Sequence, residues 1–439
     1  VVLAGFPGQA ATASLFKHAR ALAPDNPNLH FIPPADALIT PLQPALWLVD
    51  EAAALPLPLL RGLLERQHRI AFATTIHGYE GTGQGFTIRF RQHLDQHTPR
   101  WRAIHMAHPI RFGPNDPLER FGFDALCLNA AMAPPTTLAK ANTTHTTHTL
   151  LCRHTLAQNE PLLRQLFGLL VQAHYRTTPS DLHRLLDAPN MEVWASLHQN
   201  HVVAAALIAH EGGLPHETAD AIYNGRLRPR GHMLPETLTC HLGFKQAATC
   251  HIGRVVRIAV HPQTRHRHIA SALLHTIAKH HTQRWDAFGA GFGATEGLLR
   301  FWQSAGFDPI RISVRPGAAS GLCSAIVLKP LTPTGQHLHT QCRQRFAHHL
   351  PHILSDALRD MNPDLACTLL HPPPPQPHNL TPTDLQKLHA CAHGPRLYDV
   401  TVAPTWALTR HALTTPHIHQ HLTPHQKRLL TLKVIQRHT

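Results

Sequence analysis

Long apolar runs are missing from this 439-residue chain. No uninterrupted apolar stretch approaches the roughly 18–20 residues that span a bilayer, which predicts a soluble protein. The sequence starts at Val1, and its first residues read as a strand, with none of the basic, apolar and small-residue zones of a signal peptide. We therefore expect a cytoplasmic protein whose sequence is cut from a longer one.

Metal-ligand patterns are also missing. The eight cysteines never form a C-x-x-C pair and show no zinc-ligand spacing. The 41 histidines recur without ligand spacing, and we interpret them as compositional bias; examples are His145, His148, His337, His339, His348 and His349. These absences predict a reduced protein with no metal.

Acidic residues are few beside basic ones. The chain has 26 Asp and Glu against 40 Lys and Arg, which gives a net charge of +14, and its histidines add positive charge below a pH of about 6.5. A polyanion such as nucleic acid is the natural partner. A charge that only aids solubility is the alternative that composition leaves open.

The expected elements divide the chain into three parts, in line with domains of roughly 100–200 residues. Residues 1–148 alternate strands (1–4, 31–32, 45–49) with helices (11–21, 57–66), the rhythm of an α/β parallel sheet. A polar linker at 136–149 precedes a mixed α+β part at 149–331. Its expected elements are helices at 160–173, 269–282 and 297–305, a hairpin around 193–209, and strands at 255–260, 287–292, 310–314 and 324–328. Residues 332–439 form a basic, mainly helical tail with a Pro-rich break at 372–377.

One candidate nucleotide site begins where the apolar run at 46–49 ends in Asp50 and Glu51. P-loop NTPases place at such a strand end the acid that holds magnesium and the acid that orients water. The alternative is a helix N-terminus, where acidic side chains are also favoured. A glycine-rich loop at 78–85 and Arg111 could approach the phosphates. Because G-x-x-x-x-G-K-[ST] occurs nowhere in the 439 residues, we expect no ATP hydrolysis by this chain alone.

A second candidate phosphate site follows the strand at 255–260. A basic loop at 265–268 leads into a helix, and N–H groups at a helix N-terminus favour a pyrophosphate. Acetyltransferases of the GNAT type carry [QR]-x-x-G-x-[GA] here, matched by Arg265 and Ala270, with His268 in place of glycine. A side chain there would crowd the pyrophosphate or strain the turn by about 1–2 kcal/mol. Downstream, FGATE at 292–296, FW at 301–302 and GF at 306–307 have the spacing of such enzymes.

Several strings, in order, resemble the bacterial tRNA(Met) cytidine acetyltransferases. They are WLVDEAAA at 47–54, GYEGTG at 78–83, PIR at 109–111, AHYRTTP at 173–179, RPRG at 228–231, RIAVHP at 257–262 and RFWQ at 300–303. The resemblance implies the rear part of a P-loop ATPase or helicase-like domain at 1–148, a GNAT acetyltransferase domain at 149–331 and a tRNA-binding tail at 332–439. It also implies a fragment without the family's N-terminal region and lysine loop.

The implied reaction is ATP- and Mg²⁺-assisted transfer of acetyl from acetyl-coenzyme A (acetyl-CoA) to the N4 amine of the wobble cytidine of elongator tRNA(Met). Asp50, Glu51 and Arg111 would form the ATP site. Residues that would line acetyl-CoA are Ile258, Ala259, Val260, Arg265, His266, Arg267, His268, Ile269, Ala270 and Ser271, with Glu296 nearby and Ser304 where some relatives carry arginine.

His261 is a candidate base, with a structural turn role as its alternative. Candidate tRNA contacts in the tail are Arg343, Arg345, Lys387, Arg396, Lys427, Arg428, Lys433 and Arg437. Acetylation of a protein or small-molecule amine, which a GNAT fold equally permits, stays open. So does a non-catalytic RNA-binding remnant.

Overall fold

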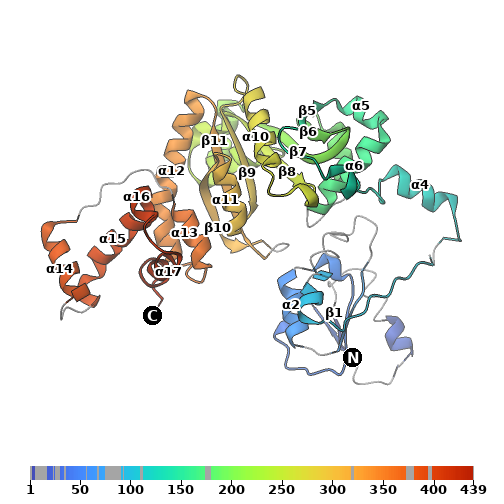
Figure 1. Cartoon of the computed structure of the whole chain (residues 1–439), viewed down its shortest axis with the longest axis horizontal. Coiled ribbons are helices and arrows are strands. Elements are labelled where there is room, and N and C mark those ends of the chain that lie inside the picture. The colour runs from blue at the N-terminus through green and yellow to red at the C-terminus, as the bar shows by residue number, and fades with distance from the viewer. Residues whose placement is uncertain are drawn as a thin grey trace. The chain divides into compact units, whose positions relative to one another are not determined.

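The computed structural model describes most of the chain (Figure 1). The described residues are 2–4, 17–22, 24, 30–33, 36–55, 57–66, 69–74, 90–91, 93–108, 112–173, 179–317, 321–371, 380–393 and 398–438. Two compact units divide the chain. One holds residues 1–208, 257–273 and 318–321, and the other holds 209–256, 274–317 and 322–439.

A parallel sheet forms the N-terminal part of the chain, as the alternating pattern predicts. Its strands are β1 (Val2–Ala4), β2 (His30–Ile32), β3 (Trp47–Val49) and β4 (Ile70–Phe72). Their order is β2-β1-β3-β4, and all three pairings are parallel. Parallel neighbours need a crossover, and α2 (Leu57–Arg66) provides one between β3 and β4, at the predicted residues.

The core of this part lies where β3 meets α2. Trp47 and Val49 are buried on alternate positions of β3, and Leu60 and Leu63 of α2 are fully buried at helical spacing. Each such side chain contributes about 1.5–3 kcal/mol through burial. This core fixes the end of β3, and therefore the two acidic residues that follow it.

A seven-stranded mixed sheet forms the centre of the chain. Its strands are β5 (Thr147–Leu151), β6 (Met191–His198), β7 (His201–Gly212), β8 (His251–Val260), β9 (Ala287–Gly293), β10 (Asp308–Pro316) and β11 (Cys323–Pro330), in the order β10-β11-β9-β8-β7-β6-β5. β8 and β9 are parallel neighbours, with α10 (Ile269–His280) between them in sequence. The predicted hairpin is confirmed: Gln199 and Asn200, both with positive φ, form the two-residue turn between β6 and β7.

The predicted linker at 136–149 is partly wrong. Its last three residues begin β5, which pairs antiparallel with β6 from Thr147↔Leu197 to Leu151↔Val193. β-branched threonines suit an extended edge strand, and their polarity hid that strand in the sequence. The end of the predicted linker therefore belongs to the sheet.

Helices fill most of the remaining described chain. They are α4 (Pro117–Ala125), α5 (Arg153–Gln158), α6 (Glu160–Ala173), α7 (Pro179–Asp187), α8 (His216–Tyr223), α9 (Met233–Glu236), α11 (Glu296–Ser304), α12 (Pro333–Leu354), α13 (Pro363–Leu370), α14 (Pro382–His393), α15 (Val402–Thr414), α16 (Pro416–His419) and α17 (Pro424–Leu430). Shorter helical turns are η1 (Asp36–Leu38), η2 (Ala52–Ala54), η3 (Pro135–Leu138), η4 (Thr237–His241), η5 (Lys245–Ala248), η6 (Pro262–Thr264), η7 (Tyr398–Thr401) and η8 (Thr431–Ile435). The predicted helix at 160–173 is confirmed as α6. Residues 17–22 are helical, whereas 11–16 and the Pro-rich break at 372–377 lie outside the described residues.

The first helix of the tail belongs to the core of the second unit. Leu338 and Cys342 of α12 are buried in one cluster with residues of β10 and β11. Arg343 is also buried, and its Nη1 donates to the Pro309 carbonyl at 2.5 Å. Its prediction as an RNA contact is therefore wrong, because the guanidinium faces the protein interior.

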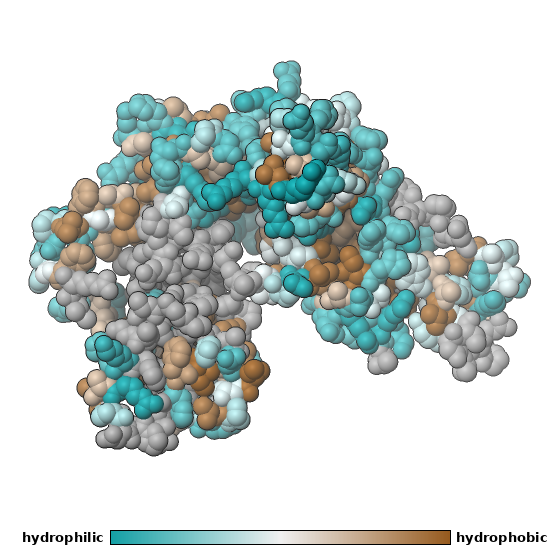
Figure 2. Space-filling view, turned by 180° about the vertical axis from the view of Figure 1, so that it is seen from behind, coloured by the Kyte–Doolittle hydropathy of each residue, from teal (hydrophilic) through white to brown (hydrophobic). Residues whose placement is uncertain are grey.

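Hydrophilic side chains cover much of the coloured surface in Figure 2, with hydrophobic patches between them. None of the helices in the described part of the chain has the length and apolar character needed to span a membrane.

Candidate functional site

Contacts with α7 and β7, in its own unit, hold the end of β8 in place. Ala259 is buried, and Ile258 and Val260 are half-buried. Next to them, Arg257 pairs with Asp181 of α7 at 2.9 Å, and the N–H of His261 donates to the Val203 carbonyl of β7.

On its other edge, β8 pairs with β9 only over the first part of its length. The parallel register with β9 covers Ile252–Val255 and Ala287–Ala290, so residues 256–260 run beyond it. The predicted strand at 255–260 is confirmed, although it starts earlier, at His251. The backbone groups of residues 256–260 on this edge are therefore not paired with β9 in this register.

Two left-handed residues lie in the loop between β8 and α10. His266 and His268 have φ of 62° and 59°, in the left-handed region. Left-handed residues beside ordinary ones turn successive N–H groups toward one side, which is the geometry of anion-binding nests. The N–H groups of the first α10 turn follow at once, and the positive end of the helix dipole adds to the attraction. Ile269 is buried and anchors this turn, while Ala270 and Ser271 beside it are half-buried.

The two arginines of the loop have different roles. Arg267 is half-buried, and its Nη1 donates to the carbonyls of Ala139 and Ala141 at 3.0 and 2.7 Å. Arg265 is exposed at the surface of the loop. Arg267 therefore fixes the loop to the segment after η3, and Arg265 is the cation better placed to meet an anion.

His261 is built into the turn. It is 1% exposed, its Nε2 lies 3.1 Å from the Ala133 carbonyl oxygen, and its Nδ1 accepts from the Gln263 N–H at 3.3 Å. A nitrogen that accepts carries no proton, so Nε2 is the protonated nitrogen and donates to Ala133. Burial lowers the pKa of His261, which keeps the ring neutral. These contacts favour the structural role over the predicted role as a base.

Glu296 and Ser304 lie at opposite ends of α11, about 12 Å apart along the helix axis at 1.5 Å per residue. The Glu296 carboxylate pairs with Arg300 at 2.7 Å, and the Ser304 hydroxyl donates to the Phe301 carbonyl at 2.8 Å. They lie in the other compact unit from the loop. The structure thus assigns both side chains a contact within their own helix.

Asp50 and Glu51 follow β3 directly, at the carboxyl edge of the parallel sheet. Ala73, after β4, accepts from the N–H of Ala52 at 2.9 Å, and the Thr74 hydroxyl oxygen accepts from the next N–H at 3.3 Å. Glu51 is left-handed, with φ 48° and ψ 42°. Such strain costs roughly 1–3 kcal/mol and tends to occur at functional sites. Arg111 and the glycine-rich loop at 78–85 lie outside the described residues.

Sequence reasoning missed a buried ion pair next to β8. Glu211 of β7, whose side chain is fully buried, accepts from Arg254 Nε at 2.5 Å and from the Leu234 N–H at 2.8 Å. The residues of the pair are 43 positions apart, so no local pattern reveals it. A lone acid inside an apolar run, as at Glu211, was the available signal.

Comparison with known proteins fits this architecture. Residues 9–129 match the model described as "RNA cytidine acetyltransferase NAT10/TcmA, helicase domain". Residues 165–267 and 263–332 match "GNAT acetyltransferase 2". The chain is thus similar to RNA cytidine acetyltransferases in its first part and to GNAT acetyltransferases in its second. Its fold class is accordingly a helicase-like domain followed by a GNAT-type domain, as the resemblance implied.

Three relatives that match the chain carry the name "tRNA(Met) cytidine acetyltransferase TmcA". The one from Nitrosococcus halophilus is 44% identical over 97% of this chain and 59% of its own length. Those from Haloarcula marismortui and Vibrio cholerae are 38% and 35% identical, over 93% and 98% of this chain and 53% and 60% of their own lengths. The chain therefore spans 53–60% of the length of these three relatives.

Proposed function

We propose that this chain transfers acetyl from acetyl-CoA to the N4 amine of the wobble cytidine of elongator tRNA(Met). The observation that carries the proposal is the left-handed loop at 265–268 between the end of β8 and α10. The match to the helicase domain of RNA cytidine acetyltransferases and the names of the relatives support the choice of substrate.

The loop fits the pyrophosphate of acetyl-CoA. Its N–H groups, the start of α10 and the exposed Arg265 would bind the phosphates, and Arg267 would hold the loop in shape. Bound acetyl-CoA supplies the acetyl group as a reactive thioester. N–H groups at the end of β8 would polarise the acyl carbonyl as the amine attacks, since such donors stabilise a developing oxyanion. A cytosine amine is a weak nucleophile, so alignment of the base carries much of the rate.

The test is acetylation by the full 439-residue chain with radiolabelled acetyl-CoA. One RNA is the elongator tRNA(Met), and the control is the same tRNA with uridine at the wobble position, which lacks the amine. Label in the first RNA alone supports the proposal. Label in protein or polyamine acceptors alone would make the chain a different acetyltransferase. Absence of acetyl-CoA binding in calorimetry would leave a non-catalytic RNA-binding protein.

We further propose that ATP with Mg²⁺ assists the reaction in a protein of the relatives' length, with Asp50 and Glu51 at the metal. Within this chain no G-x-x-x-x-G-K-[ST] loop accompanies them. The chain alone is therefore expected to hydrolyse ATP no faster than background in a phosphate-release assay. Turnover that disappears in Glu51→Gln would contradict this expectation.

A further inference from the structure

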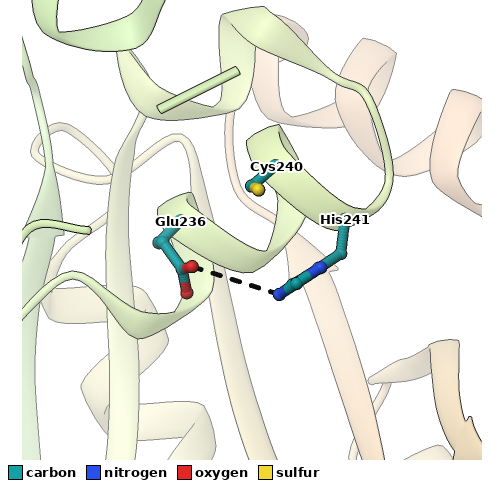
Figure 3. A group of neighbouring side chains, drawn as sticks. All are labelled: Glu236, Cys240 and His241. Carbon is teal, nitrogen blue, oxygen red and sulfur yellow. Dashed lines mark ion pairs between the residues drawn. The ribbon is translucent and has the colours of Figure 1, made fainter. Parts of the chain in front are cut away.

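Three side chains with metal-binding atoms gather on one helical turn that the proposed reaction does not use. The ligand atoms of Glu236, Cys240 and His241 all lie within 4.8 Å of one another, and Glu236 Oε1 is 4.0 Å from His241 Nε2. Figure 3 shows the three side chains on one short helical segment, with the carboxylate of Glu236 and the imidazole of His241 extended toward each other. A carboxylate, a thiol and an imidazole form a mixed set of zinc ligands.

The π-helical geometry of η4 brings these side chains together. In an α-helix, residue i+4 lies on the face of residue i, but residue i+5 lies about 140° round the axis at 3.6 residues per turn. The wider π-turn closes from i to i+5, and here the Leu242 N–H donates to the Thr237 carbonyl at 3.2 Å. This extra residue per turn brings His241 back beside Glu236, on the same side as Cys240.

The turn is rigidly held. Leu238 is fully buried in the core of the second unit, and its carbonyl accepts from the Phe244 N–H at 3.0 Å. The Thr239 hydroxyl donates back to the Phe244 carbonyl at 3.3 Å. A fixed backbone presents the three ligands without a large ordering cost, which is what a metal site requires.

We propose that Glu236, Cys240 and His241 bind a zinc-type divalent transition metal ion, with water in the remaining position. Zinc lies about 2.0–2.3 Å from such ligands, so ligand atoms around one ion lie roughly 3.3–3.8 Å apart. The 4.0 Å between the carboxylate and the imidazole would have to close by about 0.6 Å, and the widest separation in the cluster, up to 4.8 Å, by about 1 Å, which side-chain rotation can supply. Solvent reaches the site, because the side chains of Glu236 and His241 are 17% and 44% exposed.

Two arginines near Glu236 compete with a metal ion for its carboxylate. Arg228 Nε is 3.9 Å from Glu236 Oε1, on a side chain that is 78% exposed. Burial lowers the pKa of Arg311, and the nearby Glu236 carboxylate acts in the opposite direction. The metal would displace Arg228 from the carboxylate, since an exposed ion pair at this distance is weak. If Glu236 serves only as an arginine partner, no metal binds.

The test titrates the full, reduced chain with Co²⁺, which replaces zinc and gives an absorption band in the near ultraviolet when a thiolate binds it. Histidines elsewhere do not give this band, an important point in a chain with 41 of them. Wild type is expected to show the band at one equivalent. Cys240→Ser and His241→Ala should abolish it and weaken zinc binding, measured against a chromophoric chelator, by at least about tenfold.

Two further variants complete the design. Cys152→Ser, which removes an exposed thiol elsewhere, should keep both the band and the affinity. Arg228→Ala should tighten zinc binding, by about fivefold at most. The absence of a band in wild type, or a band that survives in Cys240→Ser, would overturn the proposal. His241→Ala changes a half-exposed side chain and decides the question if Cys240→Ser does not fold, which circular dichroism checks.

Discussion

Replacing His268 by glycine tests the loop at the start of α10. His268 is exposed and has a φ of 59°, where a side chain costs about 1–2 kcal/mol. Glycine removes this strain but gives the unfolded chain more freedom, which offsets about 0.5–1 kcal/mol. His268→Gly should therefore stabilise the folded chain by about 0.5–1 kcal/mol relative to His268→Ala, which keeps the Cβ atom.

The assay is urea unfolding of both variants beside wild type, followed by calorimetric titration with acetyl-CoA. The free energy of unfolding tests the backbone conformation at residue 268, whereas the affinity for acetyl-CoA tests whether the His268 side chain crowds the ligand. If the imidazole crowds the pyrophosphate, both variants bind acetyl-CoA more tightly, and glycine more than alanine. Equal stability of His268→Gly and His268→Ala would refute the left-handed conformation in solution. Unchanged or weaker affinity of both would mean that the histidine is accommodated or makes a contact.

Three other predictions follow from the structure and from the charge of the tail. Arg254→Met should destabilise the protein by about 3–5 kcal/mol in urea unfolding, because it leaves the buried Glu211 carboxylate without its cation. Adding Glu211→Met should restore most of the lost stability, and a loss below about 1 kcal/mol in Arg254→Met alone would contradict this reasoning. Burial lowers the pKa of His419 to about 4, below its ordinary 6.5, so the unfolded chain binds more protons between these pH values and stability should fall as pH drops from 6.5 toward 4. In His419→Phe the free energy of unfolding should fall less between these pH values, and a pH dependence identical to wild type would contradict the prediction. Lys427→Gln with Lys433→Gln should reduce the salt slope of tRNA binding by about 1.5–2 if each lysine contacts one phosphate, and filter binding with an identical slope would exclude both contacts.

The elements of the fold that could be predicted are those with a clear local pattern. The helices at 57–66 and 160–173 appear at their predicted residues, because apolar side chains recur there at helical spacing. The first four residues of β8 were missed, since His251, Gly253 and Arg254 interrupt its apolar run. Their neighbours on either side of the sheet decide that these residues are extended.

The candidate site also has residues that a local pattern predicts and residues that it does not. The spacing of Arg265 and Ala270 after a strand pointed to the loop, because a phosphate-binding turn is made by consecutive residues. The sequence does not predict the cluster of Glu236, Cys240 and His241, since residues five positions apart share a face in a π-turn and not in an α-helix. Arg343 was misjudged because charge is visible in the sequence and burial is not.

By itself, the sequence determined the order of the elements with a clear local pattern, the basic loop and the absence of a lysine loop, since each depends on residues close together in the chain. Only the tertiary structure decided the roles of individual side chains. Arg267 meets the carbonyl of Ala139 and His261 meets that of Ala133, each 128 residues away. Such contacts depend on how distant segments pack, and packing is a property of the whole fold that no local pattern records.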